Sequence, residues 1–161
     1  MNTLSFDIRA SLDDEDPFRV CVPVIDGTSL IDCLSRFESA FEDATGIAGL
    51  YDGLPLFNVA PPSRHWYGKE SVYGLRDGRT VILGCGECGV VDCWPFLARI
   101  TVSQTTVIWS DFLQPYRSAA KDGGIWDYSG FPVFTFQRPA YDEIIGRLPP
   151  DMPPAPPAPA T

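Results

Sequence analysis

The cysteines are the residues of this chain whose spacing most suggests chemistry. Cys85, Cys88 and Cys93 fall within nine residues of a glycine-rich segment that ends at Pro95. Cys-x-x-Cys followed by glycine is typical of a metal knuckle, in which both thiolates face one ion and the glycine relieves crowding where the chain turns back. The segment therefore predicts three candidate ligands for zinc, which would hold this hairpin together structurally.

A structural zinc site needs four ligands, and the chain has neither a second Cys-x-x-Cys nor a pair of histidines. The fourth ligand would have to be Cys21, Cys33 or His65. Two alternatives stay open: reduced thiols that pack as small apolar side chains, and a regulated disulfide between two of the three cysteines. A framework of structural disulfides is not expected, because the cysteine count is odd and the N-terminus lacks the pattern of a secretion signal.

Few residues could carry catalysis. His65 is the single histidine, so a Cys–His hydrolase would have to combine it with one of the hairpin cysteines. Gly84, Gly86 and Gly89 have the spacing of a dinucleotide-binding loop, but such a loop opens a helix, and Pro95 with the strands expected after it excludes one. Nucleophile-elbow, zinc-protease and phosphate-loop motifs are absent from the sequence. The sequence favours a non-enzymatic protein.

The charge of the chain is acidic and unevenly spread. The formal net charge is −9, and residues 1–52 contribute −8 of it, from 11 acidic and three basic residues. Binding through nucleic-acid phosphates or to anionic lipid is not expected, because both need clustered lysine or arginine. No run of 18 apolar residues occurs, so we expect no transmembrane helix. The acidic charge favours a basic protein partner, because opposite charges speed the encounter of two proteins.

Hydrophobic periodicity predicts an α+β fold, in which a mainly antiparallel β-sheet, a meander, packs against two helices. The expected strands cover residues 3–10, 18–24, 72–75, 80–83, 96–102, 105–109 and 131–136. Helices are expected over residues 29–44, capped by Thr28 or Ser29, and from Pro139 to Leu148. Residues 46–70 should form an irregular connection with one short strand.

The chain is expected to form one domain over residues 1–148. Residues 149–161 hold seven prolines and no aromatic residue, which predicts a disordered, proline-rich tail. The acidic run at residues 13–16 is typical of a solvated turn.

The predicted helix 29–44 carries an acidic face, made of Asp32, Glu38, Glu42 and Asp43. Glu42 and Asp43 would lie in its last turn, where the helix dipole disfavours anions. Anions at the C-terminal end of a helix with no compensating cation can mark a functional surface, because they lower the stability of the helix without a structural benefit. These four residues are therefore the candidate contacts to a basic partner, and an ordinary solvated face is the alternative.

Two segments place an aspartate among aromatic side chains, residues 109–112 (WSDF) and residues 126–131 (WDYSGF). Each aspartate is expected to accept a hydrogen bond from turn backbone, and the aromatic residues to pack in the core. An aromatic-walled pocket is the alternative.

The GC..CG...CWPFLARI segment at residues 84–100, together with the WSDF and WDYSGF segments, resembles a family of uncharacterised bacterial proteins. The resemblance covers roughly residues 80–147 and implies a bacterial, cytoplasmic origin, with no activity attached. With the charge pattern, it leads to the hypothesis of a non-enzymatic, acidic interaction protein, such as an immunity-type inhibitor or an accessory subunit. A zinc-binding or thiol-redox domain centred on the cysteine hairpin is the alternative.

Overall fold

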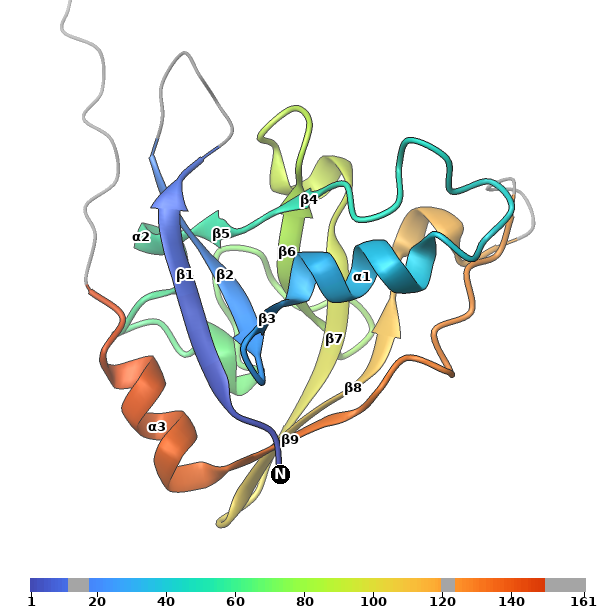
Figure 1. Ribbon diagram of the computed structural model, residues 1–161. Helices are drawn as coiled ribbons and strands as arrows, with labels where there is room; N and C mark the ends of the chain where they lie inside the picture. Colours follow the sequence, from blue (N-terminus) through green and yellow to red (C-terminus); the bar gives the residue numbers. More distant parts are fainter. Residues whose placement is uncertain (12–17, 120–123, 150–161) are drawn as a thin grey trace, which may run out of the picture.

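The computed structural model describes residues 1–11, 18–119 and 124–149. The predictions for residues 13–16 and for residues 150–161 of the tail lie outside this part. The described chain has the α+β fold expected from the sequence (Figure 1). In chain order the elements are β1 (Leu4–Ala10), β2 (Arg19–Ile25), β3 (Thr28–Ser29), α1 (Leu30–Glu38), β4 (Tyr51–Asp52), β5 (Leu54–Pro55), α2 (Leu56–Val59), the 3₁₀ helix η1 (His65–Tyr67), β6 (Thr80–Cys85), η2 (Val91–Cys93), β7 (Phe96–Val102), β8 (Thr106–Leu113), η3 (Pro115–Arg117), β9 (Phe134–Gln137) and α3 (Arg138–Gly146).

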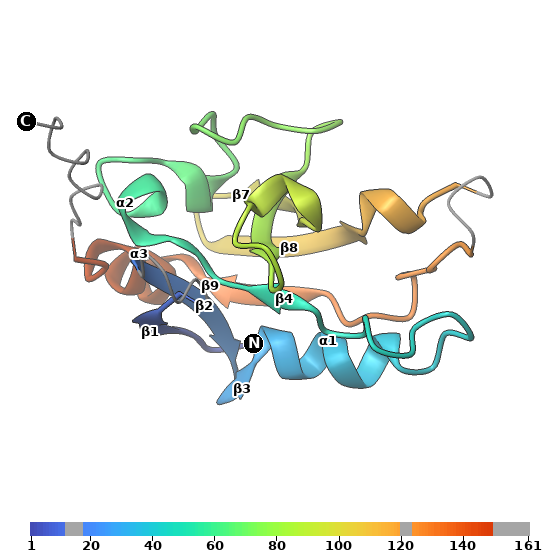
Figure 2. The same cartoon turned by 90° about the horizontal axis from the view of Figure 1, so that it is seen from above.

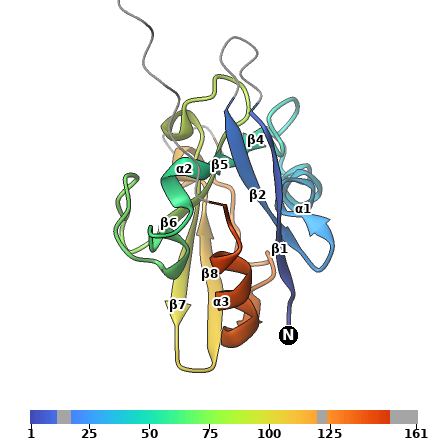
Figure 3. The ribbon, with the colours of Figure 1, turned by 90° about the vertical axis from the view of Figure 1, so that its left-hand side faces the viewer.

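The strands form two antiparallel sheets rather than one. In the first sheet β1 pairs with β2, and β2 pairs with β3 and β5. The second sheet has the order β4-β6-β7-β8-β9, and its last four strands are the predicted meander. Figure 3 shows β1 and β2 facing β6, β7 and β8 across the molecule.

The two sheets are joined at two places. Gly53 separates β4 of one sheet from β5 of the other. A Cβ atom at Gly53 would lie 2.5 Å from the carbonyl oxygen of Cys21, so this crossing point has room for glycine only. At the other side, an isolated bridge connects Asn2 with Phe136 of β9. These junctions close both sheets around one core.

Large aromatic side chains fill the centre of that core. Trp66 and Trp109 are fully buried and stack with ring centroids 5.8 Å apart. Tyr141 of α3 accepts a hydrogen bond from Trp109 Nε1 at 3.2 Å and donates one to the carbonyl of Trp66. Each such buried side chain contributes roughly 1.5–3 kcal/mol by removal of apolar surface from water. The predicted strands around residue 109 and the predicted helix after Pro139 therefore meet as expected.

The two longer helices lie on either side of β1 and β2 (Figure 2). Helix α3 packs against β1, β8 and β9, and α1 packs against β2 and β3. Ser29 caps α1 as predicted, because its Oγ accepts a hydrogen bond from the backbone N–H of Ile31 at 3.3 Å.

Helix α1 ends at Glu38, six residues before the predicted end. The hydroxyl of Ser39 bonds the carbonyl of Ser35 at 2.5 Å, a side-chain contact that competes with continuation of the helix. Phe41 and Ala44 still pack into the core, although they follow as turns. Their helical spacing in the sequence therefore reflects the burial of these two side chains and not a helical backbone.

The predicted strand at residues 72–75 does not form. The turn at Asp77 and Gly78 is present, with φ of +51° and +73°, but only an isolated bridge between Arg76 and Arg79 flanks it. The turn is instead held from β8, because Arg79 Nε donates to the carbonyl of Asp111 at 2.8 Å.

Candidate functional site

The four acidic residues predicted to contact a partner do not share one exposed face. Asp32 lies on the exposed side of α1, while Glu42 and Asp43 are exposed in the turns beyond it. Glu38 is the last residue of α1 and is fully buried, so the expectation that it faces a partner is wrong. The helix-dipole argument also fails, because neither Glu42 nor Asp43 is in the last helical turn.

Glu38 is held by donors from three other parts of the chain. The hydroxyl of Tyr51 lies 2.6 Å from Oε2, the hydroxyl of Tyr128 donates to the same oxygen, and the backbone N–H of Gly49 lies 2.8 Å from Oε1. Burial raises the pKa of Glu38, and these three hydrogen bonds partly offset that effect by favouring the ionised form. The carboxyl group therefore connects α1, β4 and the segment around Tyr128.

Asp43 anchors its turn to two residues from the other end of the chain. The indole N–H of Trp126 donates to Asp43 Oδ1 at 2.6 Å, and this bond is the largest cause of the lowered pKa of Asp43. The Nε of Arg117 lies 3.2 Å from Asp43 Oδ2. The guanidinium group of Arg117 also lies 5.4 Å and 5.6 Å from the ring centroids of Trp94 and Trp126. Arg117 thus contacts both the cysteine hairpin, through Trp94, and Trp126.

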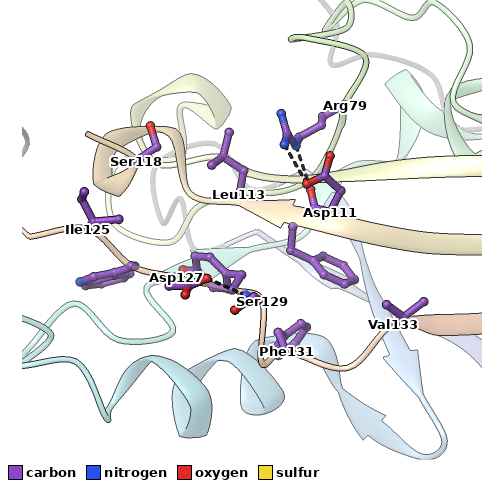
Figure 4. A pocket seen from close by; sticks show the side chains of 12 residues that line it. Arg79, Asp111, Leu113, Ser118, Ile125, Asp127, Ser129, Phe131 and Val133 are labelled. Carbon is purple, nitrogen blue, oxygen red and sulfur yellow. Dashed lines mark hydrogen bonds and ion pairs between the residues drawn. The ribbon is translucent and has the colours of Figure 1, made fainter. Parts of the chain in front are cut away.

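A cleft of about 430 Å³ opens beside Trp126, between β8 and the segment 125–133 (Figure 4). The aromatic rings of Phe112, Tyr128 and Phe131 line it, and all three are buried. The remaining lining residues are Arg79, Asp111, Leu113, Ser118, Ile125, Trp126, Asp127, Ser129 and Val133. Both aromatic segments singled out in the sequence contribute to this cleft, as the pocket hypothesis expected.

The cleft lies where β8 loses one of its neighbours. Strand β9 pairs with β8 only over residues 106–109, so no described strand pairs with residues 110–113 on that side. In the same register Pro132 would face Asp111. Pro132 has no N–H to donate, and Asp111 has a left-handed backbone (φ +54°) at a bulge of β8. Pairing stops there, and the cleft is the space between the diverging chains.

Charged side chains close one end of the cleft and mark its rim. Arg79 Nη2 lies 2.9 Å from a carboxylate oxygen of Asp111 (Figure 4). Arg99 Nη2 lies 3.2 Å from the other carboxylate oxygen. The hydrogen bond from Arg79 is the main reason that the pKa of Asp111 is lowered. Asp111 was expected to bond turn backbone, and it pairs with two arginines instead. Asp127 does bond as predicted, because it accepts the N–H of Ser129 at 2.9 Å.

Two large apolar side chains stand exposed at the rim, Ile125 at 57% and Val133 at 56% of their surface. Sequence reasoning missed both, as it missed Arg79. A second hollow of about 450 Å³ shares Ile125 and Trp126 with the cleft, and Glu42 and Asp43 line it. The apolar rim of the cleft therefore adjoins the hollow that Glu42 and Asp43 line. Concave apolar surfaces that carry a few polar groups are typical of binding sites.

Two glycines, Gly86 and Gly89, shape the cysteine hairpin, and Gly86 lies directly against the backbone of β4. Strand β6 ends at Cys85, and a Cβ atom at the next residue, Gly86, would lie 2.7 Å from the carbonyl oxygen of Tyr51. The chain then turns through Gly89 with φ of +74°, a conformation that side chains disfavour. Helix η2 leads it back to Cys93.

The three hairpin thiols meet at a hollow of about 360 Å³, whose other walls include Leu50 and Trp94. Cys88 and Cys93 are exposed, and Cys85 is buried. The neighbouring thiol of Cys93 is the largest cause of the lowered pKa of Cys88. The thiol of Cys88 in turn raises the pKa of Cys93 to about 11. The arrangement therefore favours one thiolate, at Cys88, beside a thiol that stays protonated.

The zinc hypothesis gains little from this geometry. The N–H of Glu87 points at Cys85 Sγ at 3.4 Å, as in a metal knuckle. Within the described ranges, however, no three side chains of His, Cys, Asp or Glu form a group that could hold a metal ion. The thiols are neighbours without being an assembled ligand set.

His65 does not pair with a cysteine. Its Nε2 lies 2.7 Å from the carbonyl oxygen of Val81, so Nε2 carries the hydrogen, and Nδ1 accepts from the hydroxyl of Ser71 at 2.8 Å. Burial lowers the pKa of His65 to about 4. Nε2 thus fastens η1 to β6 and Nδ1 fastens it to Ser71, which leaves neither nitrogen as the base of a Cys–His pair.

No protein-family model, curated protein or solved structure matches the chain. Among the described residues, no helix has the length and apolar character needed to cross a membrane.

Proposed function

We propose that this chain is a non-enzymatic interaction protein that binds an extended, basic segment of a partner protein in the cleft between β8 and residues 125–133. An immunity-type inhibitor or an accessory subunit would act in this way. The observation that carries the proposal is the edge of β8 at residues 110–113, which no described strand pairs on that side and which borders a cleft with an aromatic lining.

An extended peptide suits both features of the cleft. A strand added to a sheet edge gains backbone hydrogen bonds, and alternate side chains enter pockets in the sheet face. Here the rings of Phe112 and Phe131 would receive an apolar side chain, and the exposed Ile125 and Val133 would cover it. Binding would bury two side chains that the free protein leaves in water.

Charge supports a basic partner. Asp127 lies at the cleft, Glu42 and Asp43 line the adjoining hollow, and the chain as a whole carries −9. Hydrogen bonds lower the pKa of both Asp43 and Asp127, so these carboxylates stay ionised at neutral pH. Such a field accelerates encounter with a basic segment at low salt. Asp32 lines neither hollow, so the proposal keeps Glu42 and Asp43 of the four predicted contacts.

A peptide library tests the proposal even though the partner is unidentified. Hexapeptides displayed on phage are selected on the immobilised protein, and enrichment of sequences that alternate basic with aromatic or branched apolar residues is expected. Val133→Ser should weaken binding of the enriched peptides at least about tenfold, because it removes an apolar contact without adding a charge that would attract a basic peptide. Val72→Ser is the matched control, since Val72 is 72% exposed and lies outside both hollows.

Two results would reject this function. One is enrichment of acidic peptides or of none at all. The other is an equal effect of the Val133 and Val72 variants on the enriched peptides, which would place binding elsewhere. Glu42→Lys should additionally flatten the dependence of the association rate on salt.

A further inference from the structure

The cysteine hairpin is not used by the proposed function. It lies beyond Arg117 from the cleft and has its own hollow, lined by Cys85, Cys88 and Cys93. All five cysteines are free thiols, and the two exposed ones are both in this hairpin. Two exposed thiols that line the same hollow are the starting arrangement for thiol–disulfide exchange.

We propose that Cys88 and Cys93 form a reversible disulfide by exchange with a low-molecular-weight disulfide, which makes this hairpin a redox site separate from the binding cleft. The juxtaposition of the two exposed thiols at one hollow carries the proposal. The fold brings the two thiols to this hollow, because the turn at Gly89 and helix η2 lie between Cys88 and Cys93, which is five residues on.

The exchange has two balanced steps. The thiolate of Cys88 attacks one sulfur of the small disulfide, so that a mixed disulfide forms and one small thiolate leaves. Cys93 then loses its proton and attacks the Cys88 sulfur, and the second small thiol leaves with that proton. The protein dithiol is oxidised by two electrons, and one small disulfide is reduced to two thiols.

The surroundings assign the two roles. Cys88 is exposed, and the thiol of Cys93 beside it is the largest cause of its lowered pKa, which favours its thiolate, so Cys88 attacks first. Cys93 holds its proton more firmly beside Cys88, as a resolving thiol does before the mixed disulfide forms. Cys85 is buried, so the small disulfide does not reach its sulfur, which makes it a poor attacker.

Trp94 provides a signal for the change. It follows Cys93 directly, stacks on Tyr116 at 6.0 Å and contacts Arg117. A disulfide at Cys93 would shift its ring, so oxidation should alter tryptophan emission in the folded protein.

The test is a redox titration of the full chain. Reduced protein is equilibrated with mixtures of oxidised and reduced glutathione, and its cysteines are mapped by mass spectrometry without reduction. The expected product is a Cys88–Cys93 disulfide that reverses with excess reduced glutathione. Cys93→Ser should instead accumulate a stable glutathione adduct at Cys88, and Cys88→Ser should slow hairpin oxidation at least about tenfold. Cys33→Ser is the control, because Cys33 is a half-buried thiol of α1 whose burial raises its pKa.

Three results would overturn the proposal. They are a glutathione adduct that persists on Cys88 in the unaltered protein, a disulfide that joins other cysteines, and thiols that stay reduced throughout. Isolation of the chain with one zinc ion held by the hairpin, seen in native mass spectrometry, would equally replace the redox site by a metal site. None of these outcomes bears on peptide binding in the cleft, so the two proposals stand or fall separately.

Discussion

Tyr128, whose ring lines the cleft, donates a hydrogen bond to the buried carboxyl group of Glu38 at the end of α1. Gln114, which follows β8, reaches the same cluster by donating to the hydroxyl of Tyr51 at 3.2 Å. The cluster therefore fixes both sides of the cleft relative to α1. A residue that the sequence placed on the surface is the one that holds the candidate binding site together.

Replacement of Glu38 by alanine should lower the free energy of unfolding by roughly 3 kcal/mol or more. The hydroxyls of Tyr51 and Tyr128 and the N–H of Gly49 would lose their acceptor, and each buried unsatisfied donor costs about 1–3 kcal/mol. Glu42→Ala, at an exposed position four residues on, should change it by less than about 0.5 kcal/mol. Urea denaturation measures both, and similar values for the two variants would show that the cluster is dispensable.

His65 should make the protein less stable as the pH falls from about 6.5 to about 4. Burial lowers its pKa from 6.5 to about 4, so in this window the unfolded chain binds a proton that the folded protein refuses. The difference amounts to roughly 3 kcal/mol in total, fully lost below the folded pKa. Glu38 acts in the opposite direction, because its raised pKa lets the folded state bind a proton more readily as the pH falls.

A His65→Gln variant isolates this effect, because its amide does not titrate. The stability of the unaltered protein should decline more steeply between pH 7 and pH 4.5 than that of the variant, as measured by denaturation at each pH. Parallel decline of the two would mean that other groups control the acid response.

The sequence predicted where most strands lie better than it predicted where helix α1 ends or how the two sheets join. Strand β7 and most of β1, β2 and α3 follow from periodicity and from proline placement. Periodicity reports which side chains are buried, and it misled where Phe41 and Ala44 pack into the core from turns. The split into two sheets depends on Gly53, whose steric fit to Cys21 involves residues 32 positions apart and leaves no local pattern.

For the candidate sites, the local sequence pattern identified the segments that line the cleft but not how these segments are arranged in space. The WSDF and WDYSGF segments do line the cleft, yet only the register of β8 with β9 shows why a gap opens between them. Rim residues such as Ile125 and Val133 do not differ in the sequence from apolar residues of the core, because the exposure of a side chain is set by the tertiary structure. The burial of Glu38 could not be foreseen either, because its partners lie 11, 13 and 90 residues away.

Arg117 should contribute to stability mainly through the tryptophans on which it lies. Arg117→Met keeps the length of the side chain but removes the charge near Trp94 and Trp126, and it should cost about 0.5–2 kcal/mol and alter tryptophan emission. Arg147→Met is the control, since the Arg147 side chain is 70% exposed and, among the described residues, forms an ion pair only with Glu143 of α3. That exposed pair should contribute less than about 0.5 kcal/mol. Unchanged emission in the Arg117 variant would contradict the contact.

Gly53→Ala should destabilise the protein, whereas Gly146→Ala should stabilise it. A methyl group at position 53 would lie 2.5 Å from the carbonyl oxygen of Cys21 and 2.9 Å from the side chain of Val22. Both residues belong to β2, whose backbone cannot move away without breaking its pairing with β1. A loss of roughly 2–3 kcal/mol is expected from this overpacking.

At Gly146, the last residue of α3, an added methyl group meets nothing within 4 Å, and alanine favours helix over glycine by about 0.5–1 kcal/mol. The same chemical change therefore has opposite signs at the two positions, because one glycine is required by a strand crossing and the other is not. Thermal or urea unfolding of both variants measures the pair, and a neutral Gly53→Ala would mean that the two sheets join with more freedom than this crossing allows.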